Sequence, residues 1–402
     1  MGGAGVPLRE LAVVLFVALL VTYLTTGIVR FFVIRSDRMA DIRARDVHTI
    51  RKPQLGGVAM YTGFLAAIFT AGQLPALTRG FQPTTPEMNA VLVAGAVIVF
   101  VGIVDDLYEL DAVTKLVGQI AAAVVMCVMG LSWSIIYVPV GGGTTLLLDQ
   151  LQSTLLTTLF TVALINAINF VDGLDGLASG IGAIAALATL VYAMSILHDQ
   201  GGTVSAYPPA MIAAGLVGIC LGFLPHNFYP SRIFMGDTGA MLIGLLLAAA
   251  STSASGKINM SMYGTADIVA AMTPLAVVIA TIAVPMLDLV LAVTRRLAAG
   301  KSPFEADRMH LHHRLLRLGH SQRQVVLVLY AWVVAATFGA ISFSMFPTVW
   351  ASWVLVVLLL AALIYTMLPA QRIAAAKEKT SGDRTGPGST SVADERPSSS
   401  PA

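Results

Sequence analysis

The chain has 402 residues, of which 56% are hydrophobic and only 11% are charged, and its mean hydropathy is +0.81. Soluble domains carry about 25% charged residues, so this composition excludes a soluble fold. The net charge is only +2 and the basic residues flank apolar segments, so nothing indicates a nucleic-acid partner.

Apolar segments of about 20 residues recur along the chain, and this length spans a hydrocarbon core of about 30 Å. We therefore predict an all-α polytopic membrane protein with about eleven transmembrane helices. The first segment follows an N-terminus without a basic region or a small-residue cleavage site, so we interpret it as a retained helix. The predicted segments are residues 8–29, 55–76, 87–104, 112–131, 151–171, 176–197, 207–226, 239–254, 266–293, 324–346 and 348–368.

Residues 1–370 are expected to form a single integral membrane domain. Residues 371–402 are rich in Ser, Pro, Gly and mixed charge, which predicts a disordered cytoplasmic tail. Residues 132–150 contain the run Val-Pro-Val-Gly-Gly-Gly, which suggests a hairpin-like excursion on the outer side. No function is attached to this excursion.

Lysine and arginine are concentrated in alternate loops. If the N-terminus faces outward, 21 of the 24 basic residues fall on the other side, in the loops 30–54, 105–115, 227–238 and 294–323 and in the tail. The positive-inside rule places these segments in the cytoplasm. We therefore expect the N-terminus outside and the C-terminus in the cytoplasm, with the basic loops at the inner face of the plasma membrane.

Five aspartates lie at predicted helix ends on the cytoplasmic side: Asp105 and Asp106, Asp172 and Asp175, and Asp237. Ionisable groups near a membrane are costly, so they are candidates for function. Carboxylates gathered in one place repel one another unless a cation neutralises them or some are protonated. Oxygen ligands without cysteine favour Mg²⁺ or Mn²⁺ over zinc. The pattern predicts a divalent-cation site for chemistry between two anions, at the cytoplasmic face.

Each acidic motif also has a structural alternative. The pair Asp105-Asp106 alone could be a solvated helix end. In residues 166–176 the polar side chains recur at every third position, which would form a stripe that binds a neighbouring helix. Asp237 or Thr238 could be the N-cap of the following helix, although the same position aims free backbone N–H groups at an anion.

Histidines and arginine are adjacent in the last basic loop, at His310, His312, His313 and Arg314, and His48 lies on the same side. An ordinary basic loop would explain them. A zinc site is disfavoured because no His-Glu-x-x-His pair is present. Hydrogen bonding to a phosphate or a sugar fits histidine and arginine together better.

Four blocks occur in an order that resembles the polyprenyl-phosphate N-acetylhexosamine-1-phosphate transferase superfamily, glycosyltransferase family 4. They are Asp105-Asp106, residues 169–178, residues 234–239 and residues 310–313, and the resemblance spans residues 40–320. The chain is most similar to the UDP-GlcNAc branch, especially the actinobacterial members, which use decaprenyl phosphate to begin the arabinogalactan linkage unit. The sibling branch that uses UDP-MurNAc-pentapeptide typically carries three adjacent histidines, whereas this chain reads His-Leu-His-His. One departure is Gln54, where arginine is more usual.

The resemblance implies a role for each matching residue. Asp237 would be the principal Mg²⁺ ligand, with Mn²⁺ as a substitute, and Asp105 and Asp106 would lie beside the metal and the lipid phosphate. Asn169 and Asp172 would help to hold the pyrophosphate and the metal. The other substrate contacts would come from Asp175, Asn227 and Phe234 around the uracil, from His310, His312, His313 and Arg314 at the diphosphate or sugar, and from His48 in the first loop.

The implied reaction transfers GlcNAc 1-phosphate from UDP-GlcNAc to a polyprenyl phosphate and releases UMP. Direct attack by the lipid phosphate is favoured over a covalent aspartyl intermediate, because a phosphate monoester with a second pKa of about 6 is already ionised at neutral pH. Members of the family are commonly dimeric, so a homodimer is a further expectation. The alternatives are a sibling transferase with another UDP-N-acetylhexosamine or UDP-MurNAc-pentapeptide, and a secondary transporter. A transporter would place its charges near the midplane and show two related halves.

Overall fold

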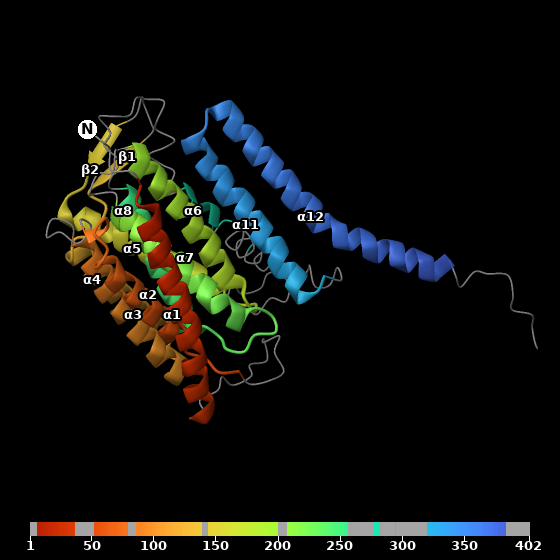
Figure 1. Cartoon of the computed structure of the whole chain (residues 1–402), viewed down its shortest axis with the longest axis horizontal. Coiled ribbons are helices and arrows are strands. Elements are labelled where there is room, and N and C mark those ends of the chain that lie inside the picture. Colours follow the sequence, from red (N-terminus) through yellow and green to blue (C-terminus); the bar gives the residue numbers. More distant parts are fainter. Residues whose placement is uncertain are drawn as a thin grey trace, which may run out of the picture.

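The computed structural model describes residues 6–36, 52–78, 86–138, 144–199, 207–255 and 320–382, with a few isolated positions between 276 and 294. Helices make up most of these ranges and lie side by side (Figure 1). Eight of the described helices are long and apolar enough to cross a membrane, which confirms an all-helical polytopic membrane protein. The helices are α1 (Leu8–Arg35), α2 (Gly56–Ala71), α3 (Glu87–Tyr108), α4 (Ala112–Val128), α5 (Gln150–Val171), α6 (Leu177–Asp199), α7 (Tyr207–Asn227), α8 (Gly236–Ser255), α11 (Gln322–Met345) and α12 (Thr348–Gly382).

Ten of the eleven predicted segments coincide with these helices. The ninth, residues 266–293, lies almost entirely outside the described residues. Helices α2 and α4 have 16 and 17 residues and are shorter than the other spans. At the C-terminus, α12 continues to Gly382, past the boundary that we predicted after residue 370. Its last turns contain Ala, Arg, Lys and Glu, which are strong helix formers, and the charged residues among them make this part too polar for a membrane segment.

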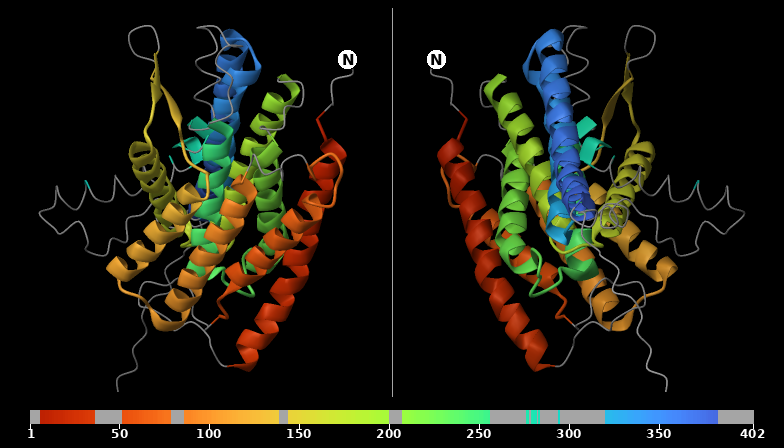
Figure 2. Two further views of the ribbon diagram at one scale, coloured as in Figure 1. Left: turned by 90° about the vertical axis from the view of Figure 1, so that its left-hand side faces the viewer. Right: turned by 90° about the vertical axis from the view of Figure 1, so that its right-hand side faces the viewer.

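The predicted hairpin between α4 and α5 is present. Strands β1 (Ile135–Val138) and β2 (Thr144–Leu147) pair antiparallel, with Ile135 opposite Leu147. Figure 2 shows this hairpin at the same end of the molecule as the start of α1, opposite the end where α1 finishes. The sequence prediction placed the N-terminus and the hairpin on one side of the membrane, and the structure puts them at one end.

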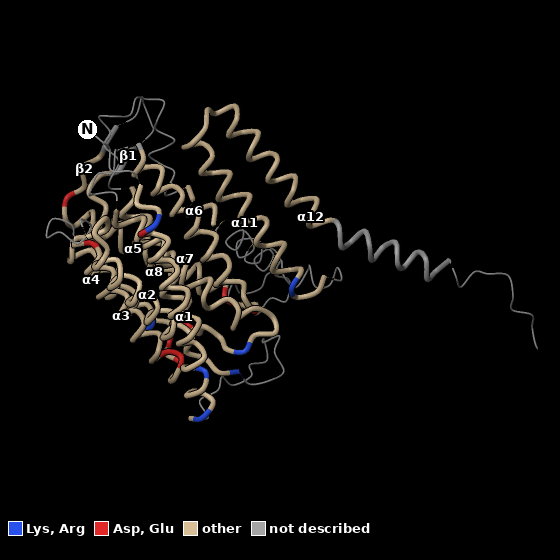
Figure 3. The backbone as a smooth tube through the Cα atoms, in the orientation of Figure 1, with Lys and Arg blue, Asp and Glu red and all other residues tan. Residues whose placement is uncertain are grey.

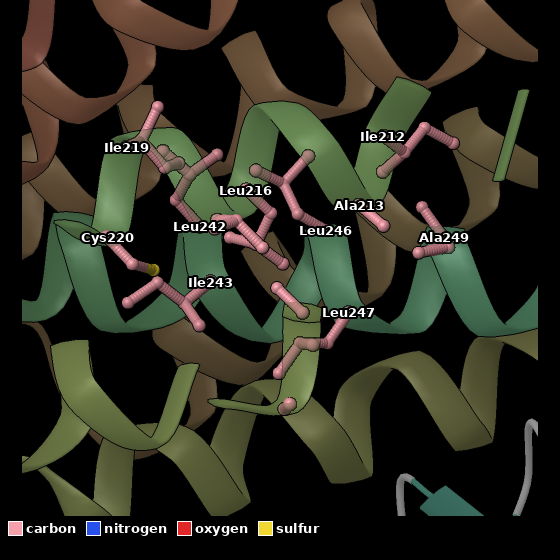
Figure 4. Packing of buried hydrophobic residues seen from close by; sticks show 14 of the residues in the cluster. Ile212, Ala213, Leu216, Ile219, Cys220, Leu242, Ile243, Leu246, Leu247 and Ala249 are labelled. Carbon is pink, nitrogen blue, oxygen red and sulfur yellow. The ribbon is translucent and has the colours of Figure 1, made fainter. Parts of the chain in front are cut away.

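Helices α7 and α8 form the centre of the bundle. The buried share of the apolar span is 94% for α8 and 89% for α7, but only 22% for α1 and 11% for α12. Figure 4 shows Leu216 and Cys220 of α7 beside Leu242 and Ile243 of α8. Helices apolar on all sides are expected in the interior, whereas exposed apolar faces such as those of α1 and α12 suit contact with lipid.

Glycines let α2 and α3 approach the first turns of α8 at the level of the backbone. A Cβ atom on Gly57 would fall closer than 3.0 Å to the backbone of Thr238 and Gly239, and one on Gly102 would meet Thr238 in the same way. Small residues permit such close approach between membrane helices. The N-terminal end of α8 is therefore enclosed by other helices, and Figure 3 shows charged residues at helix ends with uncharged stretches between them.

Candidate active site

Asp106, near the end of α3, caps the first turn of α8. Its Oδ1 accepts a hydrogen bond from the Asp237 N–H at 2.7 Å, and its Oδ2 accepts from the Thr238 N–H at 3.3 Å and the Thr238 hydroxyl at 2.6 Å. Gly236 has a φ of +71° and leaves room for this carboxylate, since a Cβ there would collide with it. From the sequence, Asp237 or Thr238 was a candidate for the N-cap of this helix. In the structure Asp106, from another helix, has this role. The Asp237 side chain takes part in other interactions.

Asp105 and Asp237 meet at the ammonium group of Lys115. The Lys115 Nζ lies 2.7 Å from Asp105 Oδ2 and 2.8 Å from Asp237 Oδ1. Asp237 Oδ1 also accepts a hydrogen bond from the Asn169 amide, and Asp105 Oδ1 accepts one from the Leu110 N–H at 3.0 Å. Helices α3, α4, α5 and α8 each contribute to this group. We call Asp105, Asp106, Lys115, Asn169 and Asp237 the α3/α8 cluster.

Asp172 lies at the C-terminal end of α5, three residues after Asn169. Burial raises the pKa of the Asp172 carboxyl to about 8, and the nearby carboxylates of Asp237, Asp106 and Asp175 act in the same direction. Asp172 therefore lies in the negative field of the α3/α8 cluster, which favours the protonated form of its carboxyl.

A second group of polar side chains surrounds Asp175, which is 2% exposed. Asp175 Oδ2 accepts from the Ser231 N–H at 2.9 Å and from Lys52 Nζ at 3.2 Å, while Oδ1 accepts from the Ser231 hydroxyl at 2.8 Å. Lys52 Nζ also donates to Ser231 Oγ at 2.7 Å and lies 5.0 Å from the centre of the Phe234 ring. We call Lys52, Asp175, Asn227, Ser231 and Phe234 the Asp175 cluster.

Asn227 supports the turn that carries Asp175. Its Oδ1 accepts from the Gly176 N–H and the Ser179 hydroxyl, both at 3.1 Å, and its amide donates to the Ile233 carbonyl at 3.2 Å. Gly176 has a φ of +81°, and its carbonyl accepts a hydrogen bond from the Tyr330 hydroxyl of α11. Asn227 is 2% exposed, so it holds this turn from the interior of the protein.

Two carboxylates of the α3/α8 cluster are chemically suited to hold a divalent cation such as Mg²⁺. In the ranges that the structure describes, no group of three or more His, Cys, Asp or Glu side chains forms a ready ligand set. Asp105 and Asp237, however, direct one oxygen each at a single cationic group. Mg²⁺ typically takes one or two carboxylates and completes its shell with water and substrate phosphates. Asp106 fits the predicted ligand role less well, since both of its oxygens bind the start of α8.

The structure brings seven of the predicted site residues into these two neighbouring groups and places an eighth, Asp172, beside them. Asp105, Asp106, Asn169 and Asp237 belong to the α3/α8 cluster and Asp172 lies beside it, while Asp175, Asn227 and Phe234 belong to the Asp175 cluster. The other predicted site residues, His48, His310, His312, His313 and Arg314, lie outside the described residues.

Two lysines of the site were not predicted. Lys52 and Lys115 were counted only as basic residues that set the topology. Each lysine lies close to an apolar segment and on the side where the acids gather, Lys52 directly after Arg51, and this placement was the available signal.

The sequence has relatives of known name. A family model described as glycosyl transferase family 4 matches residues 88–255. The chain is 53% identical over 370 residues to the decaprenyl-phosphate N-acetylglucosaminephosphotransferase of Mycobacterium tuberculosis (strain ATCC 25618 / H37Rv), covering 92% of this chain and 91% of the relative. It is 30% identical over 356 residues to the probable undecaprenyl-phosphate N-acetylglucosaminyl 1-phosphate transferase of Bacillus subtilis (strain 168), covering 87% and 89% of the two chains.

A third relative extends the comparison to another group of bacteria. The undecaprenyl-phosphate alpha-N-acetylglucosaminyl 1-phosphate transferase of Escherichia coli (strain K12) is 30% identical over 320 residues, covering 78% of each chain. The family match includes every residue of the α3/α8 cluster, and the longer alignments extend over most of the membrane domain. This polytopic membrane protein therefore belongs to glycosyl transferase family 4.

Proposed function

We propose that this protein transfers GlcNAc 1-phosphate from UDP-GlcNAc to a polyprenyl phosphate, giving polyprenyl-pyrophosphoryl-GlcNAc and UMP. The observation that carries the proposal is the convergence of Asp105, Lys115, Asn169 and Asp237 from four helices in a chain of this family. An identity of 53% to decaprenyl-phosphate enzymes, against 30% to undecaprenyl-phosphate enzymes, favours decaprenyl phosphate as the acceptor. Such a reaction would be an early membrane step in building a cell-wall glycan.

The proposed topology has eleven transmembrane helices, an outer N-terminus and a cytoplasmic C-terminus. The concentration of lysine and arginine in alternate loops supports this orientation. The two clusters would then open to the cytoplasm, where a soluble nucleotide-sugar is available, while the lipid acceptor reaches the same site from the plasma membrane. The homodimer expected from the resemblance belongs to the same proposal.

The Asp175 cluster suits the uridine end of the donor. The Phe234 ring offers a surface for stacking, and Lys52 and Asp175 offer a hydrogen-bond donor and acceptor beside it. Base stacking on an aromatic side chain contributes about 1–3 kcal/mol per base. Because Asn227 and Ser231 already hold Asp175 in place, the pocket is formed before the nucleotide binds.

The α3/α8 cluster suits the diphosphate and the acceptor phosphate. Asp237 and Asp105 would hold Mg²⁺, which supplies screening of the repulsion between two anionic substrates and stabilises charge on the leaving UMP. Asp106 fixes the backbone of Asp237 and Thr238, and Asn169 orients the Asp237 carboxylate. An oxygen of the lipid phosphate attacks the sugar-linked phosphorus, and the bond from that phosphorus to the UMP oxygen breaks. The lipid phosphate needs no strong base, because it is largely ionised at pH 7.

The function is tested by transfer of radiolabel from several UDP-sugars to prenyl phosphates of defined length, with and without EDTA. We expect lipid-linked product from UDP-GlcNAc, loss of that product with EDTA, and no product from UDP-MurNAc-pentapeptide. Transfer from the pentapeptide donor alone would assign the chain to the sibling activity. UMP release from UDP-GlcNAc without any lipid would contradict direct attack.

A further inference from the structure

We propose that Lys115 is the resident counter-cation of the metal site: its ammonium group occupies the place between Asp105 and Asp237 that a divalent cation takes, and cation binding displaces it. The identity of the competing ion rests on the proposed function. The exchange itself rests on the geometry of the α3/α8 cluster.

The carboxylates of Asp105 and Asp237 contact the same atom, the Nζ of Lys115. Asp105 Oδ2 and Asp237 Oδ1 come from different helices and lie 2.7 Å and 2.8 Å from the same Nζ atom. A Mg²⁺ ion bound to both oxygens would need distances of about 2.0–2.1 Å and would lie between them, where the ammonium now lies. Two cations at one position repel each other strongly, so the lysine and the metal exclude one another.

The ligands stay in place when the lysine leaves. Asp105 is held through its other oxygen by the Leu110 N–H, and Asp237 is held through its backbone by Asp106. Lys115 is in the first turn of α4, and Asp111 caps that turn by accepting from the Val113 and Thr114 N–H groups at 3.0 Å. The backbone of Lys115 is therefore fixed independently of its ammonium, which sits on a flexible four-carbon stem.

Exposure gives the incoming ion a route. The Asp237 side chain is 36% exposed and the Lys115 side chain 18%, whereas that of Asp105 is 5% exposed. A cation can reach Asp237 from solvent and then complete its contacts with Asp105 as the lysine withdraws. Without metal, the ammonium balances two carboxylates that would otherwise repel each other across a partly buried space.

Lys52 of the Asp175 cluster also pairs with an aspartate, but its surroundings differ from those of Lys115. Lys52 pairs with Asp175, but Ser231 donates two further hydrogen bonds to that carboxylate. Removing Lys52 leaves Asp175 with these neutral partners. Removing Lys115 leaves Asp105 and Asp237 without their shared cation. This contrast makes Lys52 the control for a general effect of losing one positive charge.

The test compares Lys115→Met, Lys52→Met and the wild-type full chain in detergent, without substrates. Binding of Mn²⁺ is measured from the EPR signal of the free ion, and thermal unfolding is measured with and without Mn²⁺. For Lys115→Met we expect Mn²⁺ affinity to rise on the order of tenfold, since a competing charge is gone. We also expect metal-free Lys115→Met to unfold at a lower temperature than wild type, with the difference closing when Mn²⁺ is added. Lys52→Met should leave Mn²⁺ affinity nearly unchanged.

Lys115→Arg is the second variant and covers the case in which the methionine variant does not fold. Arginine keeps the charge, so it should keep the weak Mn²⁺ affinity and the metal-free stability of wild type. Unchanged or weaker Mn²⁺ binding by Lys115→Met, or tighter binding by Lys115→Arg, would overturn the proposal. If wild type transfers GlcNAc 1-phosphate while one of the variants gives either of these two results, only the proposed exchange is refuted and the proposed function stands. A wild-type protein that neither binds Mn²⁺ nor makes the lipid-linked product would refute the proposed function.

Discussion

The two polar clusters each pair aspartate with lysine, yet the carboxylates differ in their exposure to solvent and in the groups that bind them. Asp175 is 2% exposed and accepts from the backbone and hydroxyl of Ser231 as well as from Lys52. Asp237 is more exposed, and its carboxylate contacts the side chains of Lys115 and Asn169. A carboxylate held by neighbouring backbone is part of the framework, whereas one held by movable side chains can change partners. This difference fits the roles proposed above, which are nucleotide recognition for the first cluster and cation exchange for the second.

The clusters also draw on different parts of the fold. The α3/α8 cluster is built from four helices, so its geometry depends on how closely these helices pack. The Asp175 cluster uses the turn after α5, the segment between α7 and α8 and the residues before α2. The Gly56 and Gly57 N–H groups donate to the Phe234 and Met235 carbonyls at 3.1 and 3.0 Å, which joins the start of α2 to the segment that leads from Phe234 of one cluster to Asp237 of the other.

The largest effect is expected where a charged ligand is lost from the exchangeable cluster. Asp237→Asn should lower transfer from UDP-GlcNAc by about 10²–10³-fold, because an amide cannot replace the charge of the carboxylate. The protein should stay folded, since the Asp106 cap uses the backbone of residue 237. Initial rates of lipid-linked product with Mg²⁺ measure the effect, and an unfolding curve controls for stability. Activity near that of wild type would remove Asp237 from the chemistry.

A substitution at the contact between α2 and α8 should impair both clusters together. A Cβ at Gly57 would collide with the backbone of Gly239, so Gly57→Ala should separate α2 from α8 and cost about 1–3 kcal/mol. Transfer activity and nucleotide affinity should fall in parallel, which a binding assay and a rate assay on one preparation can show.

Gly27→Ala in α1 is the matched control, because a Cβ at Gly27 has no atom within 4 Å. It should leave stability equal or about 0.5–1 kcal/mol higher, as expected for replacing a helical glycine. If Gly57→Ala were as harmless as Gly27→Ala, the close approach of α2 and α8 would not be needed by the site.

The sequence was enough to locate ten of the predicted apolar segments and the aspartates of the site, because hydropathy and charge placement can be read from neighbouring residues along the chain. The predicted membrane segment 348–368 agrees with the apolar span Thr348–Met367, whereas the helix α12 itself runs to Gly382, since a loss of hydropathy marks the edge of a membrane segment and not the end of a helix. From the sequence, Asp237 and Thr238 were alternatives for the cap of α8, whereas Asp106 performs this role. Asp106 is 130 residues from Gly236, and only the close packing of α3 on α8, permitted by Gly102, brings them together.

The two lysines could not be assigned for a related reason. A lysine in a short loop obeys the positive-inside rule whether or not its ammonium meets a carboxylate. Lys115 becomes part of the site because α4 begins beside the ends of α3 and α8, and Lys52 because the strand-like segment around Pro53 pairs with Phe234. These are facts of tertiary structure. The order of the four motifs, in contrast, was enough to identify the family.

A smaller effect, confined to binding, is expected in the Asp175 cluster. Phe234→Ala should weaken UDP-GlcNAc binding by about 1–3 kcal/mol, because stacking is lost while the charges around Asp175 stay. Turnover at saturating donor should change little. Equilibrium binding of UDP-GlcNAc and the rate at high donor concentration separate the two effects, with Phe228→Ala as a control in the same segment. Reduced turnover with unchanged donor affinity would move Phe234 out of the nucleotide pocket.

The smallest effect concerns Asp172, which lies between the clusters and feels the carboxylates of both. Its pKa is raised to about 8 in the folded protein, above the usual value of about 3.9 for an unfolded chain. Between these values the folded state binds more protons, so its stability falls as pH rises toward 8. Metal-free wild type should therefore unfold at progressively lower temperature from pH 5 to pH 8, and Asp172→Asn should reduce that slope by removing this titration. Thermal unfolding of both proteins across this pH range in EDTA measures the difference, and identical slopes would show that Asp172 carries its charge at neutral pH.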